Sequence, residues 1–169
     1  LKPDDPELLI EKPFVMPESW VVLGRLGFRD EPIEPGTPEE GNGFFTFGTM
    51  NNPYKYTPDL FALWADVMNR VPGSRFLFVR PEAGAPTFRA NLAREFAKRG
   101  VSEDRLLFES VRGKHMRHYN RIDIALDTAP HVGGTTTCET LWMGCPTVSL
   151  VGEAFFERLS YSNLSNAGL

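Results

Sequence analysis

From residue 43 onward, short apolar runs alternate with amphipathic segments, and this alternation restricts the fold more than any other feature of the 169-residue chain. Strands that alternate with helices predict a parallel sheet with helices on both faces, because each parallel crossover needs a connecting segment. The fold class is therefore α/β, with a doubly wound, Rossmann-like parallel sheet. The expected strands are residues 44–47, 75–79, 106–108, 122–126 and 147–151, and the expected helices are residues 57–71, 87–99, 114–120, 136–143 and 153–166.

Proline and charge set the first 41 residues apart from the rest. This segment holds seven of the 14 prolines, and ten acidic residues against four basic ones. We expect residues 1–41 to be an acidic, proline-rich connector that packs along a larger body, with Trp20 in a short apolar anchor. Residues 42–169 then form one nucleotide-binding domain. We expect the chain to be a piece that is incomplete at both ends.

Composition excludes several classes of protein. A net charge of −4 without a dominant basic cluster argues against nucleic-acid binding. No run reaches the roughly 18 apolar residues that a membrane span needs. Cys138 and Cys145 form neither a disulfide framework nor a zinc motif, so we interpret both as small buried residues in a reducing compartment. The expected location is the cytoplasm.

A candidate anion site follows the expected strand at residues 122–126. Glycines turn the chain there, and the helix that follows offers free N–H groups and the positive end of its dipole to an anion. The acid one turn into the helix is placed to accept hydrogen bonds from a ribose diol. Helix capping and dipole complementation are the alternatives that need no ligand. We favour a nucleotide-diphosphate site, since the motif exceeds what a cap requires: Gly133-Gly134-Thr135-Thr136-Thr137-Cys138-Glu139.

Two further loops are expected at the same edge of the sheet, because ligands of doubly wound sheets bind at the carboxyl ends of strands. Residues 48–55 follow the first strand and contain Asn52 and Lys55, of which the lysine is placed to neutralise a diphosphate. His115 opens the short helix after the third strand, where it can stack on a base. A solvated lysine and a structural histidine are the alternatives without a ligand.

Several common nucleotide motifs are missing from the sequence. It has neither a G-x-G-x-x-G fingerprint nor a Walker lysine, so neither a dinucleotide motif nor a P-loop is predicted. It also lacks an Asp-x-Asp pair of the kind that holds a divalent cation on a sugar diphosphate. We therefore expect no metal and no cofactor, and a lysine, a helix dipole and hydroxyls in the charge-neutralising role.

Three stretches resemble the C-terminal catalytic half of the O-GlcNAc transferases and the related SPINDLY-type fucosyltransferases, above all the bacterial members that carry tetratricopeptide repeats. The resemblance covers about residues 42–169, and its paired motifs are specific to that family. They are Phe47-Gly48-Thr49-Met50-Asn51-Asn52-Pro53-Tyr54-Lys55-Tyr56-Thr57-Pro58, then Arg121-Ile122-Asp123-Ile124-Ala125-Leu126-Asp127-Thr128, which is followed by Gly134 to Glu139, and Leu141-Trp142-Met143-Gly144-Cys145-Pro146.

The resemblance implies the nucleotide-sugar half of a GT-B glycosyltransferase. Lys55 would contact the donor diphosphate, His115 would stack near the base, and Glu139 would bind ribose. Thr135 and Thr136 at the helix start would hold phosphate, and we expect their neighbours Gly134 and Thr137 to belong to the same donor-binding site. Animal members carry histidine at Gly134, so one of their phosphate contacts has no counterpart here.

The activity that the resemblance implies is inverting, metal-independent transfer of a sugar to protein Ser/Thr hydroxyls, with UDP-GlcNAc as the favoured donor. The partners would be the donor, a protein acceptor, an upstream acceptor-binding half and its tetratricopeptide repeats. Two alternatives stay open: a sugar-nucleotide epimerase of the same fold, and a catalytically inactive nucleotide-sugar sensor or scaffold. Product analysis separates all three.

Overall fold

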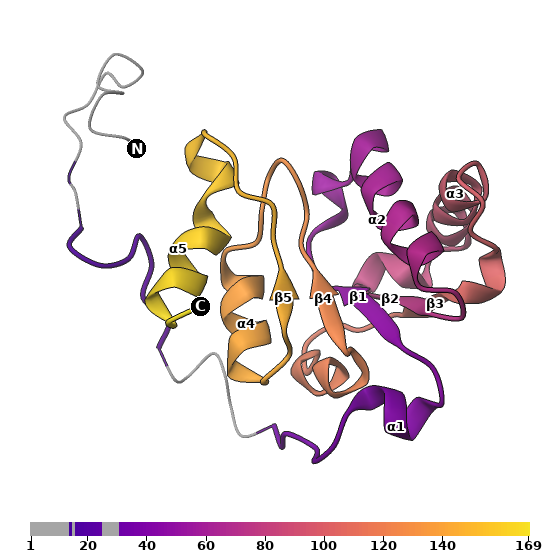
Figure 1. Cartoon of the computed structure of the whole chain (residues 1–169), viewed down its shortest axis with the longest axis horizontal. Coiled ribbons are helices and arrows are strands. Elements are labelled where there is room, and N and C mark those ends of the chain that lie inside the picture. Colours follow the sequence, from indigo (N-terminus) through magenta and orange to yellow (C-terminus); the bar gives the residue numbers. More distant parts are fainter. Residues whose placement is uncertain (1–13, 15, 25–30) are drawn as a thin grey trace.

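The chain folds around a five-stranded parallel sheet in the order β3-β2-β1-β4-β5 (Figure 1). The structure is a computed structural model that describes residues 14, 16–24 and 31–169. The strand order and the parallel pairing confirm the predicted doubly wound α/β class. The strands are β1 (Thr46–Thr49), β2 (Arg75–Val79), β3 (Leu106–Glu109), β4 (Ile124–Leu126) and β5 (Thr147–Val148).

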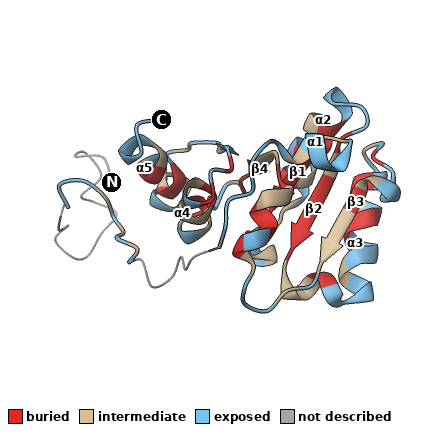
Figure 2. Ribbon diagram, turned by 90° about the horizontal axis from the view of Figure 1, so that it is seen from below, coloured by how far each residue is buried: buried red, intermediate tan, exposed pale blue. Residues whose placement is uncertain are grey.

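Helices cover both faces of the sheet. On one face, α2 (Pro58–Arg70) and α3 (Pro86–Ala97) enclose a core that includes Trp64, Phe76 and Phe96. Figure 2 shows β2 largely buried, while α3 turns an exposed face to solvent. The remaining helices are α1 (Pro38–Asn42), α4 (Thr135–Trp142) and α5 (Leu159–Asn166), with 3-10 turns η3 (Pro53–Lys55), η4 (Pro81–Gly84), η5 (Glu103–Arg105), η6 (Met116–Arg121) and η7 (Phe155–Glu157).

The second face carries the elements that follow β3 and β4. Tyr119 from η6 and Met143 at the end of α4 pack with Leu77 and Ile122 in a separate buried cluster. Cys145 belongs to this cluster and Cys138 lies beside it, and both are free thiols. The expectation that both cysteines are buried is confirmed for Cys145, while Cys138 is half-buried.

Several expected boundaries were wrong. β1 begins two residues later than predicted, because its ladder with β2 starts where Thr46 pairs with Arg75. β5 is limited to two residues, because only Thr147 and Val148 pair with β4. The expected last helix is split into η7 and α5, since the Glu157 carboxylate accepts the Ala154 N–H at 2.7 Å and holds a separate turn. The expected helix at residues 114–120 is the 3-10 turn η6.

The described part of residues 1–41 contacts the sheet and its helices. The Trp20 ring lies edge-to-face on Phe155 at 6.1 Å, and Leu23 packs against the second cluster. Helix α1 was not predicted from the sequence. Within it, the Glu39 N–H donates to the Asp123 carboxylate at 2.9 Å. The division of the chain near residue 42 into connector and domain stays a prediction.

The switch point of the sheet lies between β1 and β4. After β1 the chain passes to α2 on one face, and after β4 it passes to α4 on the other. Ligands of such sheets bind where the connections diverge in this way. The two loops meet there, because Asn51 Nδ2 donates to Asp127 Oδ1 at 3.0 Å.

Candidate functional site

The start of α4 forms the centre of the site. Gly134 is its N-cap residue and makes no side-chain cap, so none of the threonines is the cap. The first bond within the helix runs from the Cys138 N–H to the Gly134 carbonyl at 3.3 Å, which leaves the N–H groups of the first turn without a partner inside the helix. The N-terminus of α4 is therefore free to receive an anion.

The three threonines occupy different environments. Thr135 is exposed and Thr136 half-buried, and both line a cavity of about 300 Å³ beside α4. Thr137 is buried, and its Oγ1 lies 2.9 Å from Ser160 Oγ. Thr137 therefore joins α4 to α5, while a ligand contact through its side chain stays a prediction.

His115 and Glu139 line the same cavity, and their contact with a nucleoside stays a prediction. Glu139 Oε1 lies 3.0 Å from His115 Nε2, and Glu139 Oε2 accepts a hydrogen bond from the Tyr119 hydroxyl at 3.0 Å. This hydrogen bond to Glu139 raises the pKa of His115 above its usual value, although partial burial opposes the shift. Glu139 is thus held in place with acceptor capacity to spare, because a carboxylate offers about four lone-pair sites.

Lys55 lies at the end of η3, next to the loop that leads into α4. Its Nζ donates to the Val132 carbonyl at 2.8 Å and to Asn51 Oδ1 at 3.3 Å. Burial lowers the pKa of Lys55, and the charge of Asp127 partly offsets that shift. The structure thus places Lys55 at the β1–β4 switch point, on the same edge of the sheet as the start of α4.

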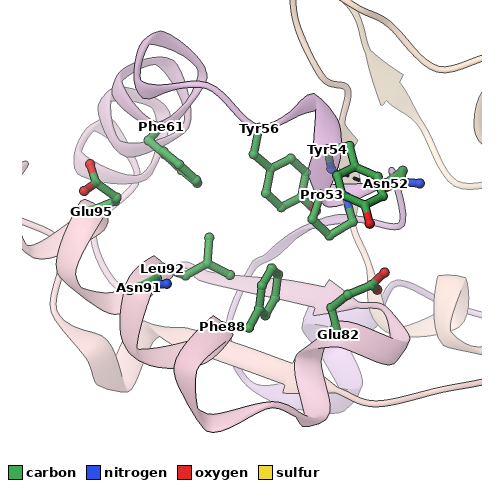
Figure 3. Close-up of a pocket in the computed structure, with 10 residues that line it drawn as sticks. All are labelled: Asn52, Pro53, Tyr54, Tyr56, Phe61, Glu82, Phe88, Asn91, Leu92 and Glu95. Carbon is green, nitrogen blue, oxygen red and sulfur yellow. Dashed lines mark hydrogen bonds between the residues drawn. The ribbon is translucent and has the colours of Figure 1, made fainter.

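Asn52 lies apart from the residues of the cavity. Its Oδ1 accepts the Tyr54 N–H at 3.1 Å and so caps η3. Asn52 also lines a second pocket of about 340 Å³ between α2, α3 and η3, into which Tyr56, Phe61 and Phe88 point (Figure 3). The structure gives Asn52 a role in the turn that carries Lys55, and its contact with a donor stays a prediction.

Gly134 lies under an aromatic ring. A Cβ atom placed on Gly134 would come within 2.9 Å of two carbons of the Trp20 ring, and Asn163 Nδ2 donates to the Gly134 carbonyl at 2.9 Å. A side chain at this position would displace Trp20. The lack of a side chain at Gly134 therefore matches the packing of the Trp20 ring.

Two charged residues of the site were not predicted from the sequence. Arg80 follows the carboxyl end of β2 and lines the cavity with Thr135. Asp127 follows β4 directly and accepts the Gly133 N–H at 2.8 Å. The signal for both was present, because each comes immediately after a buried strand at the ligand-binding edge.

Metal-ligand side chains do not gather in the described ranges. No group of three or more His, Cys, Asp or Glu residues there could hold a metal ion. Asp123 lies at the opposite end of β4 from the site, where its Oδ2 accepts the Thr46 N–H at 2.8 Å. Over the same described ranges, no helix is long and apolar enough to cross a membrane.

Gly133 approaches its neighbours too closely for any side chain. A Cβ atom on it would lie 2.7 Å from Thr137 Oγ1 and 3.0 Å from Asp127 Oδ1. We expect Gly133→Ala to cost about 1–3 kcal/mol of stability, as overpacked sites do, and to weaken any ligand at the start of α4. Thermal unfolding checks this, with Gly41→Ala as the control, since nothing lies within 4 Å of a Cβ there. Equal melting temperatures for the two variants would contradict the expectation.

The contact between His115 and Glu139 has a measurable pH signature. Because Glu139 raises the pKa of His115, the contribution of the pair to stability is complete below about pH 6.5, the unfolded value, and is lost as the pH rises through the higher folded value. NMR titration should show the pKa of His115 fall in Glu139→Gln. His131 is the internal control, since its pKa is lowered mainly by burial and then by Lys55. An unchanged His115 titration would contradict the pairing.

A parallel sheet whose switch point carries a helix N-terminus is an arrangement found in many α/β proteins that bind phosphate-containing ligands. The profile of glycosyl transferase family 41 matches residues 36–169. A probable UDP-N-acetylglucosamine–peptide N-acetylglucosaminyltransferase SPINDLY from Oryza sativa subsp. japonica is 34% identical over 99% of this chain. A second probable enzyme of the same description, SEC from Arabidopsis thaliana, is 33% identical over 79% of this chain. The chain belongs to glycosyltransferase family 41.

A solved structure agrees with this assignment. A mutant of the Thermobaculum terrenum O-GlcNAc transferase matches 80% of this chain with a TM-score of 0.72 and 35% sequence identity. The chain spans 18% of the length of the rice relative, 13% of SEC and 27% of the solved chain. This chain therefore matches only one part of each of these larger proteins.

Proposed function

We propose that this chain is the donor-binding half of an inverting, metal-independent glycosyltransferase that transfers GlcNAc from UDP-GlcNAc to Ser or Thr hydroxyls of proteins. The observation that carries the proposal is the meeting of Lys55, the free N-terminus of α4 and the His115–Glu139 pair at one edge of the sheet. The names of the family relatives support the donor and the peptide acceptor.

The proposed chemistry follows from where charge develops. As the bond between sugar and diphosphate breaks, negative charge builds up on the departing nucleotide. The Lys55 ammonium, the N–H groups of α4 and the hydroxyls of Thr135 and Thr136 would stabilise that charge more strongly in the transition state than in the ground state. These groups take over the part that a metal plays in other transferases, and His115 and Glu139 would hold base and ribose.

The rest of the active site would lie outside this chain. We propose that an upstream half, with tetratricopeptide repeats, binds the protein acceptor and completes the site. No acceptor base is assigned among the residues of this chain. The two free cysteines support a reducing compartment, the cytoplasm, as the location.

The experiment that tests the proposal is product analysis with a protein that contains both this chain and the proposed upstream half. UDP-GlcNAc labelled in the sugar is incubated with a protein acceptor in the presence of EDTA. We expect label on Ser or Thr of the acceptor, with the β configuration if transfer inverts the anomeric centre. Epimerised sugar without labelled protein would indicate the epimerase, and nucleotide binding with neither product would indicate the sensor or scaffold.

A further inference from the structure

We propose that Asp127 is the positioning residue of the donor site, and that its carboxylate sets the placement of both Lys55 and the N-terminus of α4. The proposal rests on the proposed function for the identity of its ligand, a nucleoside diphosphate. Asp127 does not line the cavity that holds Thr135 and Glu139, so it acts through its neighbours.

The Asp127 carboxylate is buried and accepts hydrogen bonds from five donors. Both oxygens meet donors alone, so the side chain must present acceptors only, which a carboxylate does and a carboxamide cannot. The donors come from every segment around the switch point. Oδ1 accepts from Asn51 Nδ2 at 3.0 Å and from the N–H groups of Thr128 and Gly133 at 2.8 Å, and Oδ2 accepts from Ser149 Oγ at 2.7 Å and from Ser160 Oγ.

One set of contacts leads to Lys55. The Lys55 ammonium is held by Asn51 Oδ1 and the Val132 carbonyl. Asn51 is itself bound to Asp127 through its amide nitrogen, and Val132 precedes the Gly133 N–H that Asp127 binds. Both acceptors of Lys55 are therefore one step from the same carboxylate oxygen.

A second set of contacts leads to α4. The Gly133 N–H donates to Asp127 Oδ1. From Gly133 the chain passes through Gly134 to Thr135, the first residue of α4. From Oδ2 the contacts continue through Ser160 Oγ to Thr137 Oγ1 in the first turn of α4. Loss of the carboxylate would remove its anchor on both the loop and the first turn of the helix, and would leave the loop held by Ser160 Oγ on the Gly133 carbonyl and Asn163 Nδ2 on the Gly134 carbonyl.

Asp123 provides a matched control on the same strand segment. Its carboxylate also accepts two backbone N–H groups, from Glu39 at 2.9 Å and from Thr46 at 2.8 Å. These contacts lie at the amino end of the sheet, away from the donor site. Asp123→Asn therefore perturbs an equivalent side chain without touching the neighbours of Lys55.

The experiment uses a protein that contains both this chain and the proposed upstream half, and it has two readouts. Calorimetry gives the dissociation constant of UDP, and NMR titration of the lysine side chains gives the pKa of Lys55 in the absence of nucleotide. In Asp127→Asn we expect UDP affinity to fall at least tenfold. We also expect a lower pKa of Lys55, because the charge that raises it has gone. Asp123→Asn should leave the pKa unchanged and the affinity within twofold.

Asn51→Ala keeps the test decisive if Asp127→Asn fails to fold. It removes the link between Asp127 and Lys55 and leaves the other four donors of the carboxylate in place. We expect UDP affinity to fall at least fivefold in this variant. Wild-type UDP affinity in a folded Asp127→Asn variant would overturn the proposal, and so would wild-type UDP affinity in Asn51→Ala. A loss of UDP affinity in Asp123→Asn equal to that in Asp127→Asn would also overturn it. A wild-type protein that binds no UDP, but whose Lys55 titration responds to Asp127→Asn alone, would refute the proposed function and support the positioning role.

Discussion

Replacement of Lys55 by alanine is expected to lower the rate constant of sugar transfer by about 10²–10³, the usual cost of removing one group that stabilises developing charge. Lys55 is anchored by Val132 and Asn51 at the switch point, so its ammonium is already oriented before the donor enters. The loss should therefore appear in kcat as well as in kcat/KM.

Steady-state kinetics of wild type, Lys55→Ala and Lys98→Ala measure this effect. Lys98 is the control because its ammonium pairs with Glu95 on the exposed surface of α3. Because burial lowers the pKa of Lys55, wild-type activity should fall on the alkaline side as the pH rises through a value below that of a free lysine, which is about 10.4. Equal rates for Lys55→Ala and Lys98→Ala would remove Lys55 from the proposed mechanism.

Replacement of Phe76 by alanine is expected to cost the fold about 3–5 kcal/mol, the range for truncating a buried aromatic side chain. Phe76 is on β2 and is fully buried under α2 and α3. Its ring stacks on Phe78 at 4.5 Å and lies 4.9 Å from Trp64 and 5.9 Å from Phe96. The indole N–H of Trp64 in turn donates to the Asp127 carbonyl at 3.2 Å, so this cluster also supports the site.

Thermal unfolding measures the cost of Phe76→Ala. At about 2–4 °C per kcal/mol for a domain of this size, the melting temperature should fall by roughly 6 °C or more. Tyr54→Ala is the matched control, because that aromatic ring is 95% exposed and its removal should change stability by less than about 0.5 kcal/mol. A similar shift in both variants would contradict the assignment of the core.

The fold was predictable because its signal is local. Alternation of apolar strands with helices gives the parallel sheet, and strands such as β2 were predicted residue by residue. β1 was misplaced because its limits depend on pairing with β2, and no propensity reports where that ladder begins. β5 was overextended for the same reason, since Leu150 and Val151 are apolar but exposed and lie outside the ladder.

The candidate site was predictable where its residues follow the carboxyl ends of parallel strands, because ligands of such sheets bind there. Thr135, Thr136 and Glu139 were singled out because a helix begins after a strand, and the structure brings them together with His115. Contacts between segments that are distant in the chain could not be predicted from the sequence. Trp20 over Gly134 and Ser160 on Asp127 join positions far apart in the chain, and only the fold places them side by side.

The central claim is that the edge of the sheet at Lys55 and α4 binds a uridine nucleotide. The most direct test is calorimetric titration, with UDP and with GDP in EDTA, of a protein that contains both this chain and the proposed upstream half. The account predicts that UDP binds without metal and that GDP binds at least tenfold more weakly, a difference of about 1.4 kcal/mol. Preferential binding of GDP would replace the proposed donor. Binding of neither nucleotide by a protein shown to be folded would contradict the account and leave the start of α4 as an ordinary helix terminus.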